Sequence, residues 1–241
     1  MSAEKLPPHL VPPEGKAFRT WEFPFPIKVR RSRKAKNLSV TIDVIDGSAR
    51  LVLPRSASQG EGWTFLKSQS KWILNELTKL PPRRLFNDGA TFALLGERCK
   101  IRHLPLLPEA THREGRELVV GGYEEPNQQV IKWLKCTAGS FIEKSSFSKA
   151  RSLNLQPPKI SIRDPRSSWG SCSELGALSF SWRLILAPPQ VMDYVISHEV
   201  AHLLEFNHGA EFWSVVANLC PRYKNAKLWL GDNGPLLLRY G

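Results

Sequence analysis

Apolar and polar residues alternate in several short stretches of the first half of the chain, as they do in strands with one buried face. Residues 38–44 alternate in this way, and Asp46-Gly47, a dipeptide typical of hairpin turns, separates them from the apolar segment 49–54. Residues 91–96 and 98–103 form a second pair of candidate strands around Gly96-Glu97, and Glu117-Leu-Val-Val120 is a further candidate strand. These patterns predict two β-hairpins and one additional strand.

Apolar residues at steps of three and four mark the expected helices. Residues 60–80 have this period and stop at Pro81-Pro82, and residues 126–153 have it from Pro126 onward. Strands are expected at 159–162 and 176–186, with a loop over 163–172. The second strand leads to Pro188-Pro189, where a strongly apolar helix is expected to begin, and shorter helices are expected at 212–219 and 227–230.

The order of these elements predicts an α+β fold in three segments. Residues 1–26 are rich in proline and lack any helical or strand period, so we expect an extended or disordered lead-in. Residues 27–125 are expected to form a β-rich N-terminal portion with one helix. Residues 126–241 are expected to form a domain in which the apolar helix packs on a mostly antiparallel sheet.

The composition is that of a globular protein that folds without disulfides. Hydrophobic residues make up 41 % of the 241 residues, which is enough for a sizeable core. The four cysteines are widely separated and form no C-x-x-C motif. The sequence opens without a segment of signal-peptide type, and no apolar run approaches the length of a membrane span. We therefore expect a cytoplasmic protein with no membrane contact.

The chain carries a net charge of +12, which favours contact with nucleic acid, acidic proteins or other polyanions. The densest basic cluster runs from Lys28 to Lys36, immediately before the first predicted hairpin. It has two interpretations, as a phosphate-binding surface or as charge that keeps an exposed strand edge soluble. The second is preferred, so nucleic acid is a secondary candidate partner, and the sequence does not indicate the oligomeric state.

The helix expected after Pro188-Pro189 contains an H-E-x-x-H pattern formed by His198, Glu199 and His202. The two histidines are four residues apart, so on a helix they lie on one face and can bind a single metal ion. The flanking residues are apolar on nearly every side, so these polar groups are expected to be buried, where they need partners. Zinc is the first candidate, with Glu199 beside the metal as a general base that takes a proton from water.

A catalytic zinc ion needs a third protein ligand, and His208 is the preferred one. It stands six residues after His202, too far round for the same helical face, so the chain must turn there. Asn207 tolerates the left-handed conformation that ends a helix, and Gly209 adds freedom. Glu205 and Glu211 are the alternative ligands. The metzincin spacing is matched, but Glu205 replaces its required glycine and no methionine follows for a Met-turn.

Four segments of the chain form a recognisable set of motifs: the basic segment 30–33 with the following hairpin, Trp169-Gly-Ser-Cys172, residues 182–189 and residues 198–213. Together they resemble the YgjP-like metallopeptidase family, which is distantly similar to the SprT-like proteases and other zincins. The resemblance covers the chain from about residue 27 onward. It implies a zincin-like catalytic domain in which His198, His202 and His208 bind zinc and Glu199 is the general base.

The leading hypothesis is therefore a zinc metallopeptidase that acts on a peptide or protein substrate. Arg183 and Tyr223 are candidates for stabilising the oxyanion. The strand at 176–186 is expected to run beside the cleft, either as an edge strand that pairs with an extended substrate or as an internal strand. Two alternatives remain open: a metal-dependent hydrolase of nucleotides or other phosphate esters, and a protease recruited to nucleic acid through Lys28 to Lys36.

Overall fold

The structure is a computed structural model that describes residues 23–241 and contains two compact units, one ending at Arg83 and one spanning Arg84–Gly241. Each unit has a hydrophobic core of its own. Most of the expected lead-in, residues 1–22, lies outside the described residues, and Phe23 and Phe25 are buried in the core of the first unit. The segment boundary expected after residue 125 coincides with the start of a helix inside the second unit.

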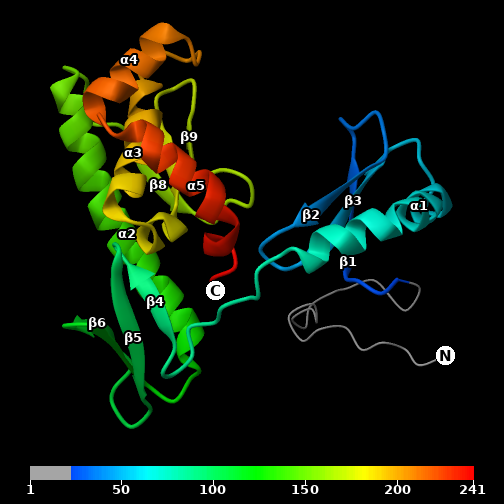
Figure 1. Ribbon diagram of the computed structural model, residues 1–241, viewed down its shortest axis with the longest axis horizontal. Coiled ribbons are helices and arrows are strands. Elements are labelled where there is room, and N and C mark those ends of the chain that lie inside the picture. Colours follow the sequence, from blue (N-terminus) through cyan, green and yellow to red (C-terminus); the bar gives the residue numbers. More distant parts are fainter. Residues whose placement is uncertain (1–22) are drawn as a thin grey trace. The chain divides into compact units, whose positions relative to one another are not determined.

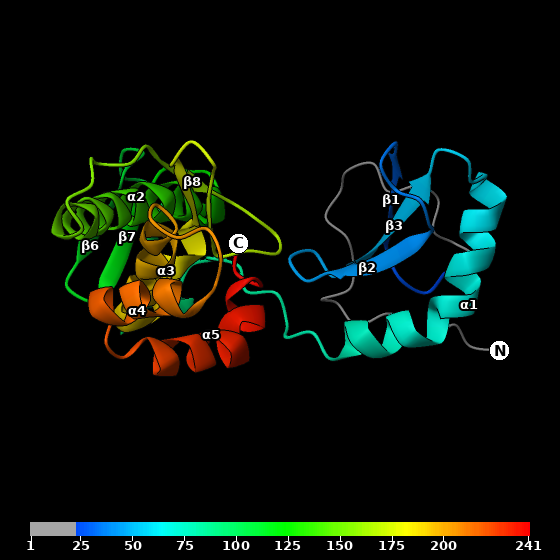
Figure 2. The same cartoon turned by 90° about the horizontal axis from the view of Figure 1, so that it is seen from above.

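The first unit is a three-stranded sheet with one helix, α1 (Gln59–Thr78), packed against it (Figure 2). Strands β2 (Ser39–Asp43) and β3 (Ser48–Pro54) form the expected antiparallel hairpin. Strand β1 (Ile27–Ser32) lies at the edge of the sheet, parallel to β3, and contains the first part of the basic cluster. Ser58 and Glu61 form a capping box that fixes the start of α1.

The second unit begins with a four-stranded sheet in the order β4-β5-β7-β6. Strands β4 (Thr91–Leu94) and β5 (Glu97–Leu104) are the expected second hairpin, joined by Leu95 and Gly96, whose φ angles are 52° and 82°. Positive φ at both turn residues matches the right-handed twist of the strands. β7 (Glu117–Gly121) confirms the further predicted strand, and it pairs with β6 (Thr111–Glu114), which the sequence pattern did not indicate.

A second sheet in this unit has the order β8-β10-β9 and corrects two predictions. The expected strand at 176–186 is a strand only over β10 (Leu178–Ser181), because Trp182–Leu186 form a 3-10 helix, η2, in which every side chain is buried and no face alternates. The expected loop at 163–172 contains β9 (Gly170–Cys172). β10 lies between β8 (Ile160–Arg163) and β9, so the edge strand is β9 and not the segment leading into the apolar helix.

The helices of the second unit are α2 (Pro126–Ser152), α3 (Pro189–Ala201), α4 (Ala210–Leu219) and α5 (Tyr223–Leu237). α3 contacts α2 on one side and α5 on the other, and it also packs on β9 (Figure 1). α5 is longer than the short helix expected at 227–230, since it continues through Gly231. In the part of the chain that the structure describes, no helix is long and apolar enough to span a bilayer.

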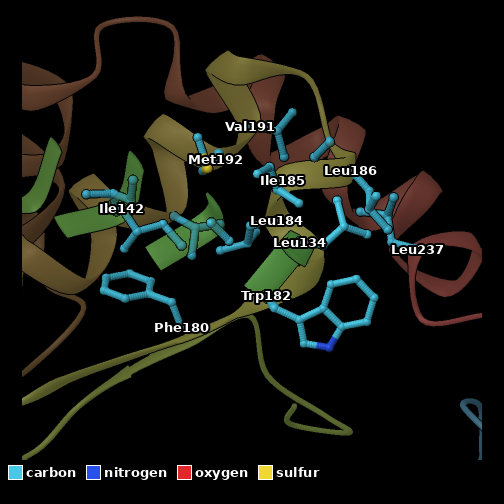
Figure 3. Close-up of a cluster of buried hydrophobic side chains, with 14 of the residues drawn as sticks. Leu134, Ile142, Phe180, Trp182, Leu184, Ile185, Leu186, Val191, Met192 and Leu237 are labelled. Atoms are coloured by element: carbon cyan, nitrogen blue, oxygen red, sulfur yellow. The ribbon is translucent and has the colours of Figure 1, made fainter. Parts of the chain in front are cut away.

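The core of the second unit lies where β10, η2, α2 and α3 meet (Figure 3). Phe180 and Trp182 face Leu134 and Ile142 of α2, and Met192 of α3 closes the cluster. All but Met192 are fully buried. The architecture is therefore α+β, with the apolar helix α3 held on several sides by the core.

A three-histidine candidate metal centre

α3 carries the H-E-x-x-H residues at its C-terminal end. The helix begins at Pro189 as expected and ends at Ala201, with His202 as its C-cap. Its flanking residues are buried on almost every side, so the helix cannot rotate without exposing apolar surface. His198 and Glu199 are thereby fixed in position by the packing of the helix.

His208 reaches the helix by a route that differs from the prediction. Asn207 and Gly209 do not adopt positive φ angles, and Gly209, with φ −79°, serves as the N-cap of α4. α3 instead tightens into turns, in which Leu203 N donates to Val200 O and Leu204 N donates to Ala201 O, both at 3.0 Å. These i to i+3 bonds are of 3-10 type and end the helix without a left-handed residue.

The three histidines converge on one point. One ring nitrogen from each of His198, His202 and His208 lies within 4.8 Å of the other two. In the described part of the chain, no carboxylate joins this group. Nε2 of His208 is 3.1 Å from Nε2 of His198. Two nitrogens bound to one tetrahedral zinc ion at about 2.0–2.1 Å would be roughly 3.3 Å apart, so this separation fits the ion. Glu205 and Glu211, the alternative third ligands, lie outside the group.

The surroundings of the imidazoles also suit a metal. Nδ1 of His202 donates a hydrogen bond to the carbonyl of Glu205 at 3.0 Å, which leaves Nε2 unprotonated and free to act as a ligand. Burial and the neighbouring imidazoles lower the pKa of His198 to about 4, so this ring is neutral at physiological pH. Burial also lowers the pKa of His202. Neutral imidazoles are the form that binds zinc.

Phe212, the fully buried aromatic residue of α4, packs against all three imidazoles. Its ring centroid lies 4.5 Å from that of His202, 4.7 Å from that of His208 and 4.9 Å from that of His198. Such a contact restricts the ring orientations and excludes water from behind the ligands. In the sequence, Phe212 shows only the spacing of a helical residue, because its contact with the imidazoles depends on the packing of α4 against α3.

Glu199 lies beside the histidines and is 5 % exposed. Burial raises the pKa of its carboxyl to about 7. β9 passes so close to this side chain that a Cβ atom at position 170 would force the Glu199 side chain to shift. The sequence pattern does not indicate that Gly170 belongs to the site, although it lies in the Trp169-Gly-Ser-Cys172 motif.

A hollow of about 220 Å³ opens next to Glu199 and His198. Its walls are largely apolar or aromatic and come from Trp169 of the loop before β9, Tyr194 of α3 and Leu230 of α5. Burial and then the charge of Glu199 raise the pKa of Tyr194 to about 12, so its phenol is neutral. In the part of the chain that is described, no lysine or arginine lines this hollow.

The free edge of β9 borders this hollow. Ser181 N donates to Trp169 O and Ser173 N donates to Ala177 O, both at 2.9 Å, so Trp169 and Ser173 belong to hydrogen-bonded pairs of the ladder. The groups that alternate with them, the N–H and C=O of Gly170 and Cys172, therefore point away from β10. No described strand pairs with this edge.

The two candidates for oxyanion stabilisation differ in their placement. Arg183 is 2 % exposed, pairs with Asp164, and donates from Nε and Nη2 to the carbonyl of Tyr240 at 3.2 and 3.0 Å. Its guanidinium is thus committed to the structure. Tyr223 stacks on Trp213, with ring centroids 5.4 Å apart. The ring centroid of Trp213 lies 5.9 Å from that of His198.

Cys172 of β9 lacks the environment of an activated nucleophile. Burial, followed by the charge of Glu199, raises the pKa of its thiol, which keeps it protonated and unreactive. His103 and His112 stand at no motif spacing from a second metal-binding residue in the sequence, and they do not belong to the three-histidine group.

Comparisons with known proteins give one family and one solved structure. Residues 36–233 match the YgjP-like metallopeptidase domain. No curated protein matches the sequence. The crystal structure of the metallopeptidase zymogen of Pyrococcus abyssi abylysin is similar over 38 % of this chain and 93 % of that chain, with 24 % identity and a TM-score of 0.35.

Proposed function

Because this chain belongs to the YgjP-like metallopeptidase family, we propose that it hydrolyses peptide bonds at a zinc ion held by His198, His202 and His208, with Glu199 as the general base. The observation that carries this proposal is the convergence of three imidazole nitrogens within 4.8 Å of one another. Three histidine ligands leave a fourth position open, which is the ligand set of a catalytic zinc site. When bound, zinc supplies the Lewis acidity that peptide hydrolysis needs.

Glu199 is suited to move the protons of this reaction. A pKa of about 7 lets the carboxylate take a proton from the attacking water near neutral pH and deliver it to the nitrogen of the leaving amine. Its burial also keeps bulk water away from the carboxylate. Tyr223 is the remaining candidate for stabilising the oxyanion, since Arg183 is occupied elsewhere in the fold.

An extended peptide fits the site through the free edge of β9. The outward N–H and C=O groups of Gly170 and Cys172 can form the backbone hydrogen bonds of a strand added to the sheet. Gly170 lies against Glu199, so a peptide bound there passes next to the general base. The apolar hollow bounded by Trp169, Tyr194 and Leu230 would then receive an apolar side chain of the substrate.

The alternative of phosphate-ester hydrolysis has less support at this site. The hollow beside Glu199 is lined by no lysine or arginine among the described residues, so its walls offer no guanidinium or ammonium group to bind a phosphate. For nucleic-acid recruitment, part of the basic cluster is already neutralised, because Lys28 pairs with Asp46. The other basic residues of the cluster lie on the edge strand β1 or just after it, where charge is expected to keep a strand edge soluble.

The proposal is tested by metal analysis combined with digestion of a peptide library. We expect about one zinc ion per chain and chelator-sensitive cleavage of casein or peptides, without turnover of nucleoside triphosphates. Glu199→Gln should retain zinc and lose at least about 100-fold in kcat. Glu211→Gln makes the same chemical change at an exposed position near the site and should leave zinc content and kcat unchanged. Full activity of Glu199→Gln would contradict the assigned base.

A further inference from the structure

The sheet formed by β8, β10 and β9 carries a second hollow, whose chemistry differs from that of the apolar one. It has a volume of about 350 Å³ and is lined mainly by serines together with Arg163. In the described part of the chain, no aspartate or glutamate lines it. We call it the serine hollow. Its walls offer hydroxyl and guanidinium donors and one positive charge.

The strand register explains why these serines gather on one face. Ser179 of β10 is paired with Ser161 of β8 on one side and with Ser171 of β9 on the other, so the three side chains form a row across the sheet. The neighbouring residues of β10, Leu178 and Phe180, point the other way into the core. The row of hydroxyls is therefore a built feature of the face that does not contact the core.

Arg163 follows Ser161 by two residues on β8 and thus lies on the same face. Its Nε donates to Oγ of Ser161 at 3.3 Å, which orients the guanidinium along the row. Among the described residues Arg163 has no ion-pair partner, because the adjacent Asp164 pairs with Arg183. The hydroxyls of Ser171 and Ser179 likewise have no hydrogen-bond partner within the described residues. The serine hollow thus has unused donors and uncompensated charge.

Gly170 connects the serine hollow to the proposed catalytic cleft, since it lines both. Successive side chains of a strand point to opposite faces of the sheet it joins. A peptide paired with the free edge of β9 would therefore direct one side chain towards the apolar hollow and the next towards the serine hollow. The two hollows are then neighbouring subsites with opposite chemical preferences.

We infer that the serine hollow is a substrate subsite for an acidic side chain, with Arg163 as the specificity-determining residue. A carboxylate matches it because a guanidinium fork and serine hydroxyls can together donate to both carboxylate oxygens. The preferred substrates are peptides in which an aspartate or glutamate adjoins a large apolar residue at the cleavage site. This inference rests on the proposed peptidase function.

The test uses pairs of peptides that differ only by glutamate or glutamine, scanned through the positions around a cleaved bond. With the zinc-loaded full chain we expect kcat/KM to be about tenfold higher for glutamate at one of these positions. Arg163→Gln should bring this ratio to about one, and Arg163→Glu should make a lysine peptide the preferred one. Arg163→Lys keeps the charge and should retain part of the preference.

Lys159→Gln is the matched control, because Lys159 is exposed immediately before β8 but does not line the serine hollow. It removes the same charge from the basic chain and should leave the glutamate preference unchanged. An equal loss of preference in Lys159→Gln and Arg163→Gln would show only general attraction to a basic protein and would overturn the subsite.

Binding of the same peptide pairs to zinc-loaded Glu199→Gln separates this inference from the proposed function. If the wild type cleaves peptides but neither cleavage nor binding distinguishes glutamate from glutamine, the subsite is wrong and the peptidase stands. If no peptide is cleaved but the glutamate peptide binds about tenfold more tightly and Arg163→Gln removes this, the subsite stands and the catalytic proposal fails.

Discussion

Gly170 and Glu199 lie so close together that no side chain can stand between them. A Cβ atom at position 170 would be 2.6 Å from both Cγ and Oε1 of Glu199 and 2.8 Å from Cδ. Real Cβ atoms do not approach other heavy atoms to that distance. The strand edge that borders the cleft and the buried carboxylate are therefore positioned by the same contact.

Gly170→Ala should displace the Glu199 carboxylate and lower kcat by at least about tenfold, because even small misplacement of a catalytic group is costly. The three heavy atoms nearest to the added Cβ all belong to Glu199 and none to a histidine, so zinc content should be retained. Gly231→Ala is the control, since a Cβ atom there meets nothing within 4 Å. Steady-state kinetics and metal analysis check the prediction, and an unchanged kcat in Gly170→Ala would show that the carboxylate tolerates the shift.

His208→Ala should weaken zinc binding by at least about 100-fold, because it removes one of three protein ligands. His112→Ala, a change of the same type at an exposed residue outside the three-histidine group, should have no effect. Competition with a chromogenic chelator measures both affinities. Unchanged zinc affinity in His208→Ala would move the third ligand to a carboxylate such as Glu205.

Phe212→Ala should lower both the stability of the second unit and the affinity for zinc. Removing a fully buried phenylalanine typically costs about 3–5 kcal/mol of unfolding free energy, and here it also frees the three imidazoles from their common contact. Phe141→Ala removes a side chain that is 46 % exposed and should cost far less. Denaturant titration of metal-free protein and chelator competition separate the two effects.

The stability of the metal-free protein should depend on pH through Glu199. Its folded-state pKa of about 7 exceeds the ordinary value of 4.5, so the folded state holds a proton that the unfolded state releases between these pH values. Proton binding by Glu199 therefore stabilises the folded state below pH 4.5. As the pH rises to 7 this stabilisation is lost, which lowers the free energy of unfolding by about 3 kcal/mol. The lowered pKa values of His198 and His202 have the opposite effect, because they make the free energy of unfolding rise with pH.

Glu199→Gln isolates this effect, because the histidine contributions remain in both proteins. The free energy of unfolding of the wild type, relative to that of Glu199→Gln, should fall as pH rises from about 4.5 to 7. Denaturant titrations of both proteins at several pH values, with chelator present, measure this difference. A difference that does not vary with pH would contradict the burial of an ionisable carboxyl at this position.

The sequence by itself determined the elements whose patterns are local. The structure confirms the helices predicted from the period of residues 60–80 and 126–153. It also confirms the hairpin at Asp46-Gly47 and the helix start at Pro188-Pro189. The spacing of His198 and His202 on one helix also needs no tertiary information, because helical geometry alone places them on one face. The family was likewise recognisable from its motifs.

Tertiary structure decided everything that depends on contacts between distant segments. Residues 182–186 are apolar apart from Arg183, a pattern that fits a strand or a buried 3-10 helix equally well, and only packing against α2 and α3 selects the helix. Pairing with β8 makes β10 internal and leaves β9 as the edge. The turn that returns His208 to His198, the contact of Phe212 with the imidazoles, and the need for glycine beside Glu199 arise because chain segments approach one another in space, which no local pattern encodes.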